Sequence, residues 1–247
     1  MGIRQRPTIR HLTDLVPLIE RQDGFGPILE ALRRGESATI DGAWGSTSAL
    51  TVASLANHAP PPLLVVLPRV GDVDDFAYDL SAFLSEPPRI LSAWEGLPRG
   101  RLLTDTILGG RLGLWREIQS PSPPRVIVTS IAALLQPLPD LEVIESATIR
   151  LKVGETLDPQ DLLKWLHARG CERVTSIEMP GEYVVHGGIV DVYSPDAPYP
   201  LRIEFFGDEI ESIRQFDVQT QQRVADLKSA SITLIAEDHW KSLFEGA

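Results

Sequence analysis

Two short runs dominated by apolar residues, at 63–67 and 126–129, limit what this chain can fold into more than any other feature of its sequence. The first is bounded by prolines, as expected of a parallel strand that is covered on both faces, and the second has the same texture. Apolar residues at helical spacing follow the first run at 73–84 and precede the second at 104–118. This alternation predicts an α/β domain with a mostly parallel sheet and right-handed crossovers.

The same half of the chain contains further expected elements. They are a helix, loop and helix over 12–34, a short strand at 37–41, a helical stripe at 49–56, a short strand at 89–91 and a short helix at 130–135. A glycine-containing turn separates the strand at 37–41 from the helix that follows it.

A proline-rich segment at 136–140 marks a change of texture, and we place a domain boundary there. Beyond it we expect a strand at 148–153, a helix from 158 to 167, four β-prone stretches at 171–178, 188–193, 201–206 and 210–216, and a last one at 231–235. This pattern predicts a smaller α+β domain with an antiparallel sheet. We therefore divide the chain into residues 1–140, 141–225 and 226–247.

Charge and composition exclude several classes of function. The chain has 247 residues, 23 Lys and Arg against 34 Asp and Glu, and a formal net charge of −11. An acidic chain is a poor candidate for sequence-independent binding of nucleic acid, so a protein partner is favoured. There is no apolar run long enough for a membrane span and no secretory signal, and Cys171 is the only cysteine, so we expect a cytoplasmic protein without disulfides. The five histidines show no metal-ligand spacing, and we expect no metal and no cofactor.

A glycine-containing turn occupies the place of a phosphate-binding loop, between the expected strand at 37–41 and a helix. Its positions are Gly42, Gly45, Thr47, Ser48 and Ala49. In the motif G-x-x-x-x-G-K-[ST], backbone N–H groups and a lysine hold the phosphates and a hydroxyl holds magnesium. Registered on Gly42, the last three positions are Thr47, Ser48 and Ala49, so the glycine, lysine and hydroxyl are all missing. The first lysine of the chain is Lys152, which excludes a shifted register. We interpret the segment as an inactive structural turn.

The stretch 201–210 is the most informative candidate binding element. Alternation on a strand places Leu201, Ile203 and Phe205 on one face and Arg202, Glu204 and Phe206 on the other. The first set is the expected core face, and a turn at 207–208 predicts a hairpin. Arg202 and Phe206, about 13 Å apart along the strand, are of the types enriched in interface hot spots. The alternative is that Phe206 folds over the strand end and Arg202 pairs with Glu204 or Glu211 in solvent; the residues alone favour neither.

Residues 181–193, 201–211 and 214–221 closely resemble the UvrB-homology region of the bacterial transcription-repair coupling factors (Mfd). The run R-I-E-F-F-G-D-E-I-E-S-I-R at 202–214 is shared in style with UvrB itself. The segment A-W-E-G-L-P at 93–98 resembles the W-E-x-L-P element of the coupling factors, and the tyrosine hairpin by which UvrB clamps DNA is absent.

The resemblance implies a fold and a role. Residues 1–140 would be a helicase-like domain 1a with a degenerate phosphate loop, residues 141–225 a domain 2 that binds UvrA, and residues 226–247 the start of a domain 1b return segment. Arg202 and Phe206 match family positions that contact UvrA, whereas His186 stands where the family often has arginine. In the full-length family, other domains engage RNA polymerase and double-stranded DNA.

We therefore expect a non-catalytic module that recruits UvrA by presenting the surface that UvrB presents. One alternative is a UvrB-like ATP-dependent DNA-repair enzyme, against which the missing lysine and hydroxyl of the loop both count. Another alternative is an acidic adaptor that binds an unrelated protein. No membrane contact is expected.

Overall fold

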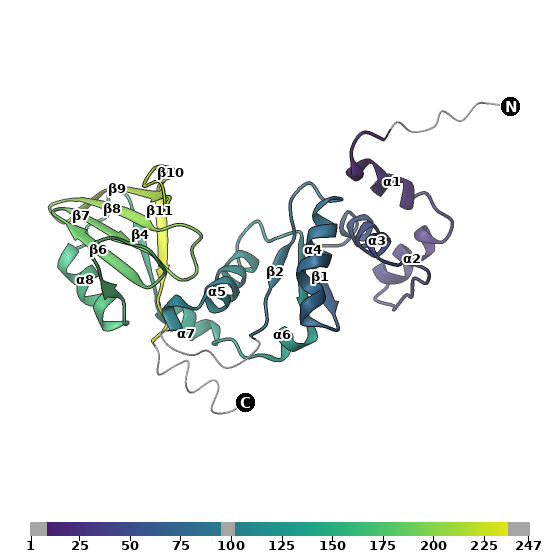
Figure 1. The fold of residues 1–247 in the computed structure, drawn as a ribbon, viewed down its shortest axis with the longest axis horizontal. Coiled ribbons are helices and arrows are strands. Elements are labelled where there is room, and N and C mark those ends of the chain that lie inside the picture. Colours follow the sequence, from purple (N-terminus) through teal and green to yellow (C-terminus); the bar gives the residue numbers. More distant parts are fainter. Residues whose placement is uncertain (1–8, 95–101, 237–247) are drawn as a thin grey trace. The chain divides into compact units, whose positions relative to one another are not determined.

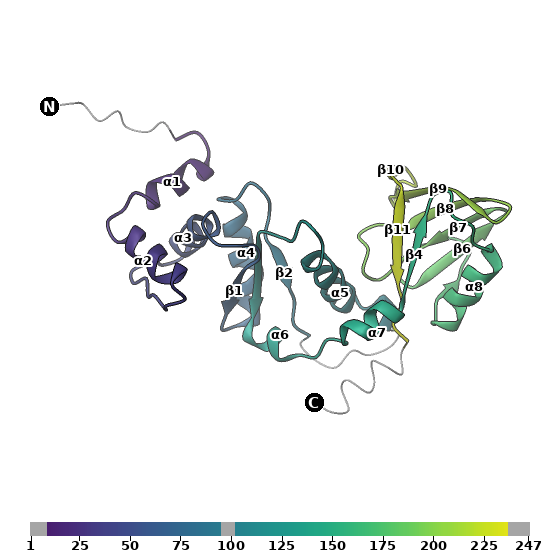
Figure 2. The ribbon, with the colours of Figure 1, turned by 180° about the vertical axis from the view of Figure 1, so that it is seen from behind.

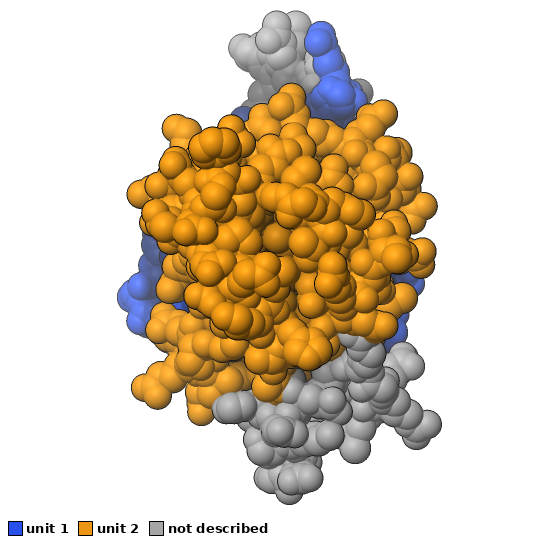
Figure 3. Space-filling model, turned by 90° about the vertical axis from the view of Figure 1, so that its left-hand side faces the viewer, with its two compact units in different colours: residues 1–93, 116–135 blue, residues 94–115, 136–247 orange. Residues whose placement is uncertain are grey.

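The computed structural model describes residues 9–94 and 102–236, which fold into two compact units (Figure 3). Unit 1 comprises residues 1–93 and 116–135, and unit 2 comprises residues 94–115 and 136–247. Each unit has its own hydrophobic clusters. Residues 95–98, which carry most of the resemblance to the W-E-x-L-P element, lie outside the described residues. So do residues 237–247 of the expected return segment.

Unit 1 is an α/β structure built on a three-stranded parallel sheet with the order β1-β3-β2 (Figure 1). Its strands are β1 (Leu63–Leu67), β2 (Arg89–Leu91) and β3 (Val126–Ser130). Its helices are η1 (Leu12–Leu15), α1 (Val16–Ile19), α2 (Phe25–Arg33), α3 (Ser46–Ala56), η2 (Val70–Asp72), α4 (Val73–Ser81) and α6 (Ile131–Leu135). The predicted parallel α/β arrangement is therefore confirmed for this unit.

The core of unit 1 lies between its sheet and two helices. Alanines of α3 (Ala49, Ala53 and Ala56) pack with Ala77 and Leu80 of α4 against the strands, where small side chains let the helices approach closely. On β1, however, burial alternates, and Leu64 and Val66 are 46% and 41% exposed. The prediction that both faces of this strand are covered is wrong: only β3 is buried at every position.

The expected strand at 37–41 is also absent, and these residues form an exposed, irregular segment without ladder partners. A β-prone sequence stays a strand only where a neighbouring strand satisfies its backbone groups and a core covers one face. Neither condition holds here, so the segment before the turn at Gly42 is irregular.

Unit 2 contains a six-stranded mixed sheet with the order β10-β9-β8-β7-β6-β5, in which only the β5–β6 pair is parallel, and a separate antiparallel pair, β11–β4 (Figure 2). Its strands are β4 (Thr148–Lys152), β5 (Glu172–Arg173), β6 (Glu182–His186), β7 (Ile189–Val192), β8 (Leu201–Phe206), β9 (Glu209–Phe216), β10 (Arg223–Leu227) and β11 (Ser229–Thr233). Its helices are η3 (Leu102–Thr104), α7 (Leu141–Ser146) and α8 (Pro159–Ala168), and α5 (Thr106–Ile118) contributes residues to both units.

Most of these elements lie where the sequence predicts them, and some differ in their bounds. The stretch 171–178 is a strand only at 172–173, and the last strand begins at Ser229 rather than 231. Strands β6 and β10 and helix α7 were not predicted as separate elements. The predicted antiparallel character of this region is confirmed, apart from the parallel β5–β6 pair.

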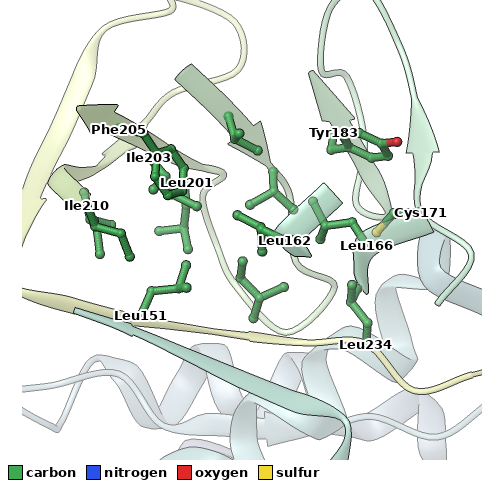
Figure 4. Packing of buried hydrophobic residues seen from close by; sticks show 14 of the residues in the cluster. Leu151, Leu162, Leu166, Cys171, Tyr183, Leu201, Ile203, Phe205, Ile210 and Leu234 are labelled. Carbon is green, nitrogen blue, oxygen red and sulfur yellow. The ribbon is translucent and has the colours of Figure 1, made fainter. Parts of the chain in front are cut away.

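One face of the six-stranded sheet packs on α8 and on the β4–β11 pair. Leu162 and Leu166 of α8 belong to the same core as Ile203 of β8, and Figure 4 shows Leu166 beside Tyr183 and Cys171, with Leu151 of β4 on the side of the core away from the sheet. Asp158 begins α8 by accepting a hydrogen bond from the backbone N–H of Gln160 at 2.8 Å. Because this core covers one face of the six-stranded sheet, the opposite face is the one available to solvent or a partner.

Helix α5 approaches the loop between β7 and β8 through glycines. A Cβ atom on Gly109 would lie 2.0 Å from the carbonyl oxygen of Pro195, and one on Gly113 would lie 2.9 Å from that of Asp196. A Cβ atom on Gly110, in the same turn of the helix, would meet no atom within 4 Å. The loop that joins the two strands therefore rests on a helix surface that only glycine allows.

We predict that Gly109→Ala destabilises the protein by about 1–3 kcal/mol, because the added methyl group overlaps backbone that cannot move independently. Gly110→Ala is the matched control: it gives the same gain in helix propensity without the clash, and we expect it to be neutral or stabilising by up to about 1 kcal/mol. Urea unfolding followed by tryptophan fluorescence measures both. Equal midpoints for the two variants would contradict the close approach.

Candidate interaction site

The hairpin of β8 and β9 carries two of the candidate binding residues. Its strands are joined through Gly207, at a φ of +62°, and Asp208. Leu201, Ile203 and Phe205 are buried in the core, which confirms the predicted alternation and leaves Arg202, Glu204 and Phe206 on the opposite face. We call this opposite face of β6–β9 the outer face.

Phe206 is the exposed aromatic residue of the outer face. It ends β8 opposite Glu209, and 79% of the residue is accessible to solvent. It does not fold over the strand end, so that part of the alternative interpretation is wrong. The end of a paired strand thus presents a large apolar ring to solvent, and exposed aromatic rings are of the type enriched in protein-binding hot spots.

Arg202 is held by a carboxylate that sequence reasoning did not consider. Its Nε and Nη2 atoms donate hydrogen bonds to the two carboxylate oxygens of Asp191 on β7, at 2.7 and 2.6 Å. The side chains of Arg202 and Asp191 are 24% and 7% exposed. The suggested pairing with Glu204 or Glu211 in solvent is therefore wrong: Asp191 faces Arg202 directly across the β7–β8 ladder.

The guanidinium of Arg202 has a second contact, because its Cζ lies 4.6 Å from the centre of the Phe216 ring on β9. Phe216 is buried with Ile177 and Val184 in a small cluster on the outer face. The hydrogen bonds from Arg202 to Asp191 raise the pKa of the guanidinium above its usual value, so the group stays charged. Arg202 is thus a positioned cation.

A second ion pair lies beside the first. Glu204 accepts hydrogen bonds from Arg214 and, at 2.6 Å, from the hydroxyl of Ser212, both on β9. The two arginines of the outer face are therefore each paired with a carboxylate of the same sheet. The face offers directional hydrogen-bond donors rather than a field of free positive charge.

His186 lies at the same end of the sheet as Phe206. It is the exposed last residue of β6, and Gly187 and Gly188 connect it to β7. Gly188 accepts a hydrogen bond from the backbone N–H of Phe205 at 2.8 Å, and a Cβ atom on Gly188 would lie 2.8 Å from the Phe205 carbonyl oxygen. This close approach sets the turn after His186 against the end of β8, so the structure brings the three candidate binding residues onto one sheet.

Asp191, Arg214 and Phe216 are the members of this site that the sequence did not reveal. Glu204 was expected on this face, but its partner is Arg214 rather than Arg202. One signal was available: Asp191 is the single charged residue of Ile189–Val192, between two buried valines. A buried carboxylate needs a cationic or hydrogen-bonding partner. Its spacing in sequence did not reveal that the partner would be Arg202.

The turn that resembles a phosphate loop lies in unit 1. Gly42 and Gly45 have positive φ values of 80° and 54°, and α3 begins directly after Gly45. Ala49, at the position of the magnesium-binding hydroxyl, is fully buried in the core. Ser48 donates its hydroxyl to the carbonyl of Ala43 at 2.9 Å. Thr47 is exposed in the first turn of α3.

Among residues 9–94 and 102–236, no helix combines the length and the apolar character that crossing a membrane requires. Within the same part of the chain, no three His, Cys, Asp or Glu side chains come together in a group that could hold a metal ion.

Comparison with known proteins connects this geometry to a family. A model of the "UvrB interaction domain" family matches residues 149–240, which include the whole outer face. The chain is 34% identical over 200 residues to a transcription-repair-coupling factor of Mycobacterium tuberculosis, covering 77% of this chain and 16% of that protein. The corresponding protein of Myxococcus xanthus is 32% identical over 216 residues, covering 84% of this chain and 18% of the relative. That of Bacillus subtilis is 26% identical over 224 residues, covering 90% and 19%.

The chain is homologous to the transcription-repair coupling factors. The homology extends over most of its length, and its matched region contains a UvrB interaction domain. The matched part spans less than a fifth of these relatives, at 16–19% of their length. The family membership expected from the resemblance of residues 181–221 is thereby confirmed.

We predict that Arg202→Ala lowers the free energy of unfolding by about 3 kcal/mol, because it leaves the buried carboxylate of Asp191 without its cation. Phe206→Ala, on the same strand, removes an exposed ring and should change stability by less than about 0.5 kcal/mol. Chemical denaturation followed by circular dichroism compares the two variants. A destabilisation by Arg202→Ala no larger than that of Phe206→Ala would contradict the buried pair.

Proposed function

We propose that this chain is the non-catalytic UvrA-recruiting module of a transcription-repair coupling factor. The observation that supports this most is the exposed ring of Phe206, presented by the β8–β9 hairpin that also carries the positioned guanidinium of Arg202, within the region that matches the UvrB interaction domain. The role follows from mimicry: the module presents to UvrA the surface that UvrB presents in nucleotide excision repair.

In this proposal each candidate residue has its own task. Phe206 inserts into an apolar pocket of UvrA and supplies most of the binding free energy through burial of its ring. Arg202 donates hydrogen bonds from its outward edge and so fixes the orientation. His186 contributes a donor without the permanent charge and fork of an arginine, so its contact is weaker.

Unit 1 is, in the same proposal, a helicase-like domain with a degenerate phosphate loop that does not hydrolyse ATP. The loss of the strand before the loop and the burial of Ala49 support this interpretation. RNA polymerase and double-stranded DNA would be engaged by other domains of the full-length protein. The energy for movement along DNA would likewise come from outside this chain.

Binding of UvrA tests the proposal directly. We expect wild-type chain to bind UvrA saturably in an isothermal titration. Phe206→Ala should weaken binding by at least about 2 kcal/mol, or roughly thirtyfold, because a buried aromatic anchor is lost. Tyr78→Ala is the matched control, since Tyr78 is an exposed aromatic residue of α4 in unit 1, and it should leave the affinity unchanged.

Two outcomes would contradict this role. Absence of binding by the folded wild-type chain would exclude UvrA recruitment by this module. Binding that Phe206→Ala leaves intact would favour an acidic adaptor with a different docking surface.

An ATPase assay tests the inactive loop. We expect the chain with magnesium and ATP to release phosphate no faster than buffer, because a lysine and a hydroxyl for the phosphates and magnesium are missing from the loop. Hydrolysis that increases with the concentration of chain and is abolished by EDTA would instead support a UvrB-like ATP-dependent enzyme.

A further inference from the structure

We propose that Asp191 is a positioning residue of the docking surface: it orients the Arg202 guanidinium so that its outward edge meets the acceptor group of the partner. This inference rests on the proposed function, because the partner of the surface is UvrA. It assigns a role to a side chain that itself makes no contact with the partner.

The first observation is how the guanidinium is occupied. An arginine has five N–H donors in a fixed planar fork. Within the described residues, the hydrogen bonds of Arg202 both go to Asp191, from Nε and Nη2. The three remaining donors are both N–H groups of Nη1 and the second N–H of Nη2, and one donor from each nitrogen points from the Nη1–Nη2 end of the fork, next to the edge that Asp191 occupies.

The second observation is that the orientation of Arg202 is fixed in two directions. Asp191 fixes the rotation of the guanidinium within its plane, and the ring of Phe216, 4.6 Å from Cζ, supports one of its faces. Asp191 itself lies in β7, paired with Val184 on β6 and with Arg202 on β8. A buried carboxylate in the middle of a sheet has little freedom to follow a moving side chain.

The third observation is the charge around the pair. Asp191 neutralises Arg202, and Glu204 neutralises Arg214 on the neighbouring strand. Long-range attraction of the partner is therefore weak, and Arg202 must act through short, directional hydrogen bonds. Such bonds depend on orientation, and a preorganised side chain loses less entropy when it binds. Asp191 thus affects affinity through geometry.

A double-mutant cycle tests this proposal with UvrA as the probe. Asp191→Asn keeps the size of the side chain but removes one acceptor and the charge. Arg202→Gln keeps a donor toward position 191 but removes the fork. We expect each single variant to weaken binding about tenfold, and Asp191→Asn to have less than about a twofold effect in the Arg202→Gln background.

Asp161→Asn is the control for loss of one negative charge. Asp161 is an exposed carboxylate of α8 that pairs with Lys164, and α8 packs on the opposite face of the sheet. We expect its affinity for UvrA to stay within about twofold of the wild type. Circular dichroism melting of each variant confirms that the fold is retained.

A second measurement needs no partner. In the 15N–1H NMR spectrum, the Nε–H signal of Arg202, assigned by its loss in Arg202→Gln, should exchange slowly with water in wild type and broaden or vanish in Asp191→Asn. An unchanged signal in Asp191→Asn would overturn the positioning role whether or not UvrA binds. Equal weakening by Asp191→Asn in both backgrounds of the cycle would overturn it as well. A wild-type chain that shows the signal but does not bind UvrA would overturn the recruiting role and, with it, the docking task of Asp191.

Discussion

The register of the β7–β8–β9 ladder is the constraint on which the rest of unit 2 depends. Because side chains alternate along β8, pairing Ile203 with Val190 and Ile213 puts all three into one core and turns Arg202 outward. A shift by one residue would bury the charged side chains and expose the core. The same pairing that fills the core therefore also builds the candidate docking surface.

An irregularity in that ladder adjusts the end of the hairpin. The register shifts between Glu204 and Phe205, so β9 contributes one extra residue there. Such a bulge increases local twist and changes the direction of nearby side chains. Backbone hydrogen bonds from Gly154 and Leu157 to Ile210 and Asp208 then attach the hairpin end to the segment after β4. Phe206 is consequently presented from a supported strand end.

On the outer face, hydrogen bonds compensate the loss of hydration of the buried charged groups. Asp191 is nearly fully buried, and a carboxylate in that position is tolerated because it receives two charge-assisted hydrogen bonds. Phe216 supplies an apolar surface for the guanidinium, and the hydrophobic cluster with Val184 closes one end of the face. The opposite end, with Phe206 and His186, stays open to solvent.

The sequence by itself determined the local patterns: the α/β alternation of unit 1, the two faces of β8, and the turn at Gly207. These follow from periods of two and 3.6 residues and from turn chemistry, which act over a few neighbours. Tertiary structure decided what depends on distant partners. Residues 37–41 form no strand because no neighbouring strand pairs with them, and Leu64 and Val66 are exposed on one face of β1. Arg202 forms its ion pair with Asp191, eleven residues earlier, rather than with Glu204 or Glu211. Which side chains pair across strands depends on the register of the strands and on how they fill a common core, and neighbouring residues in the sequence do not determine either.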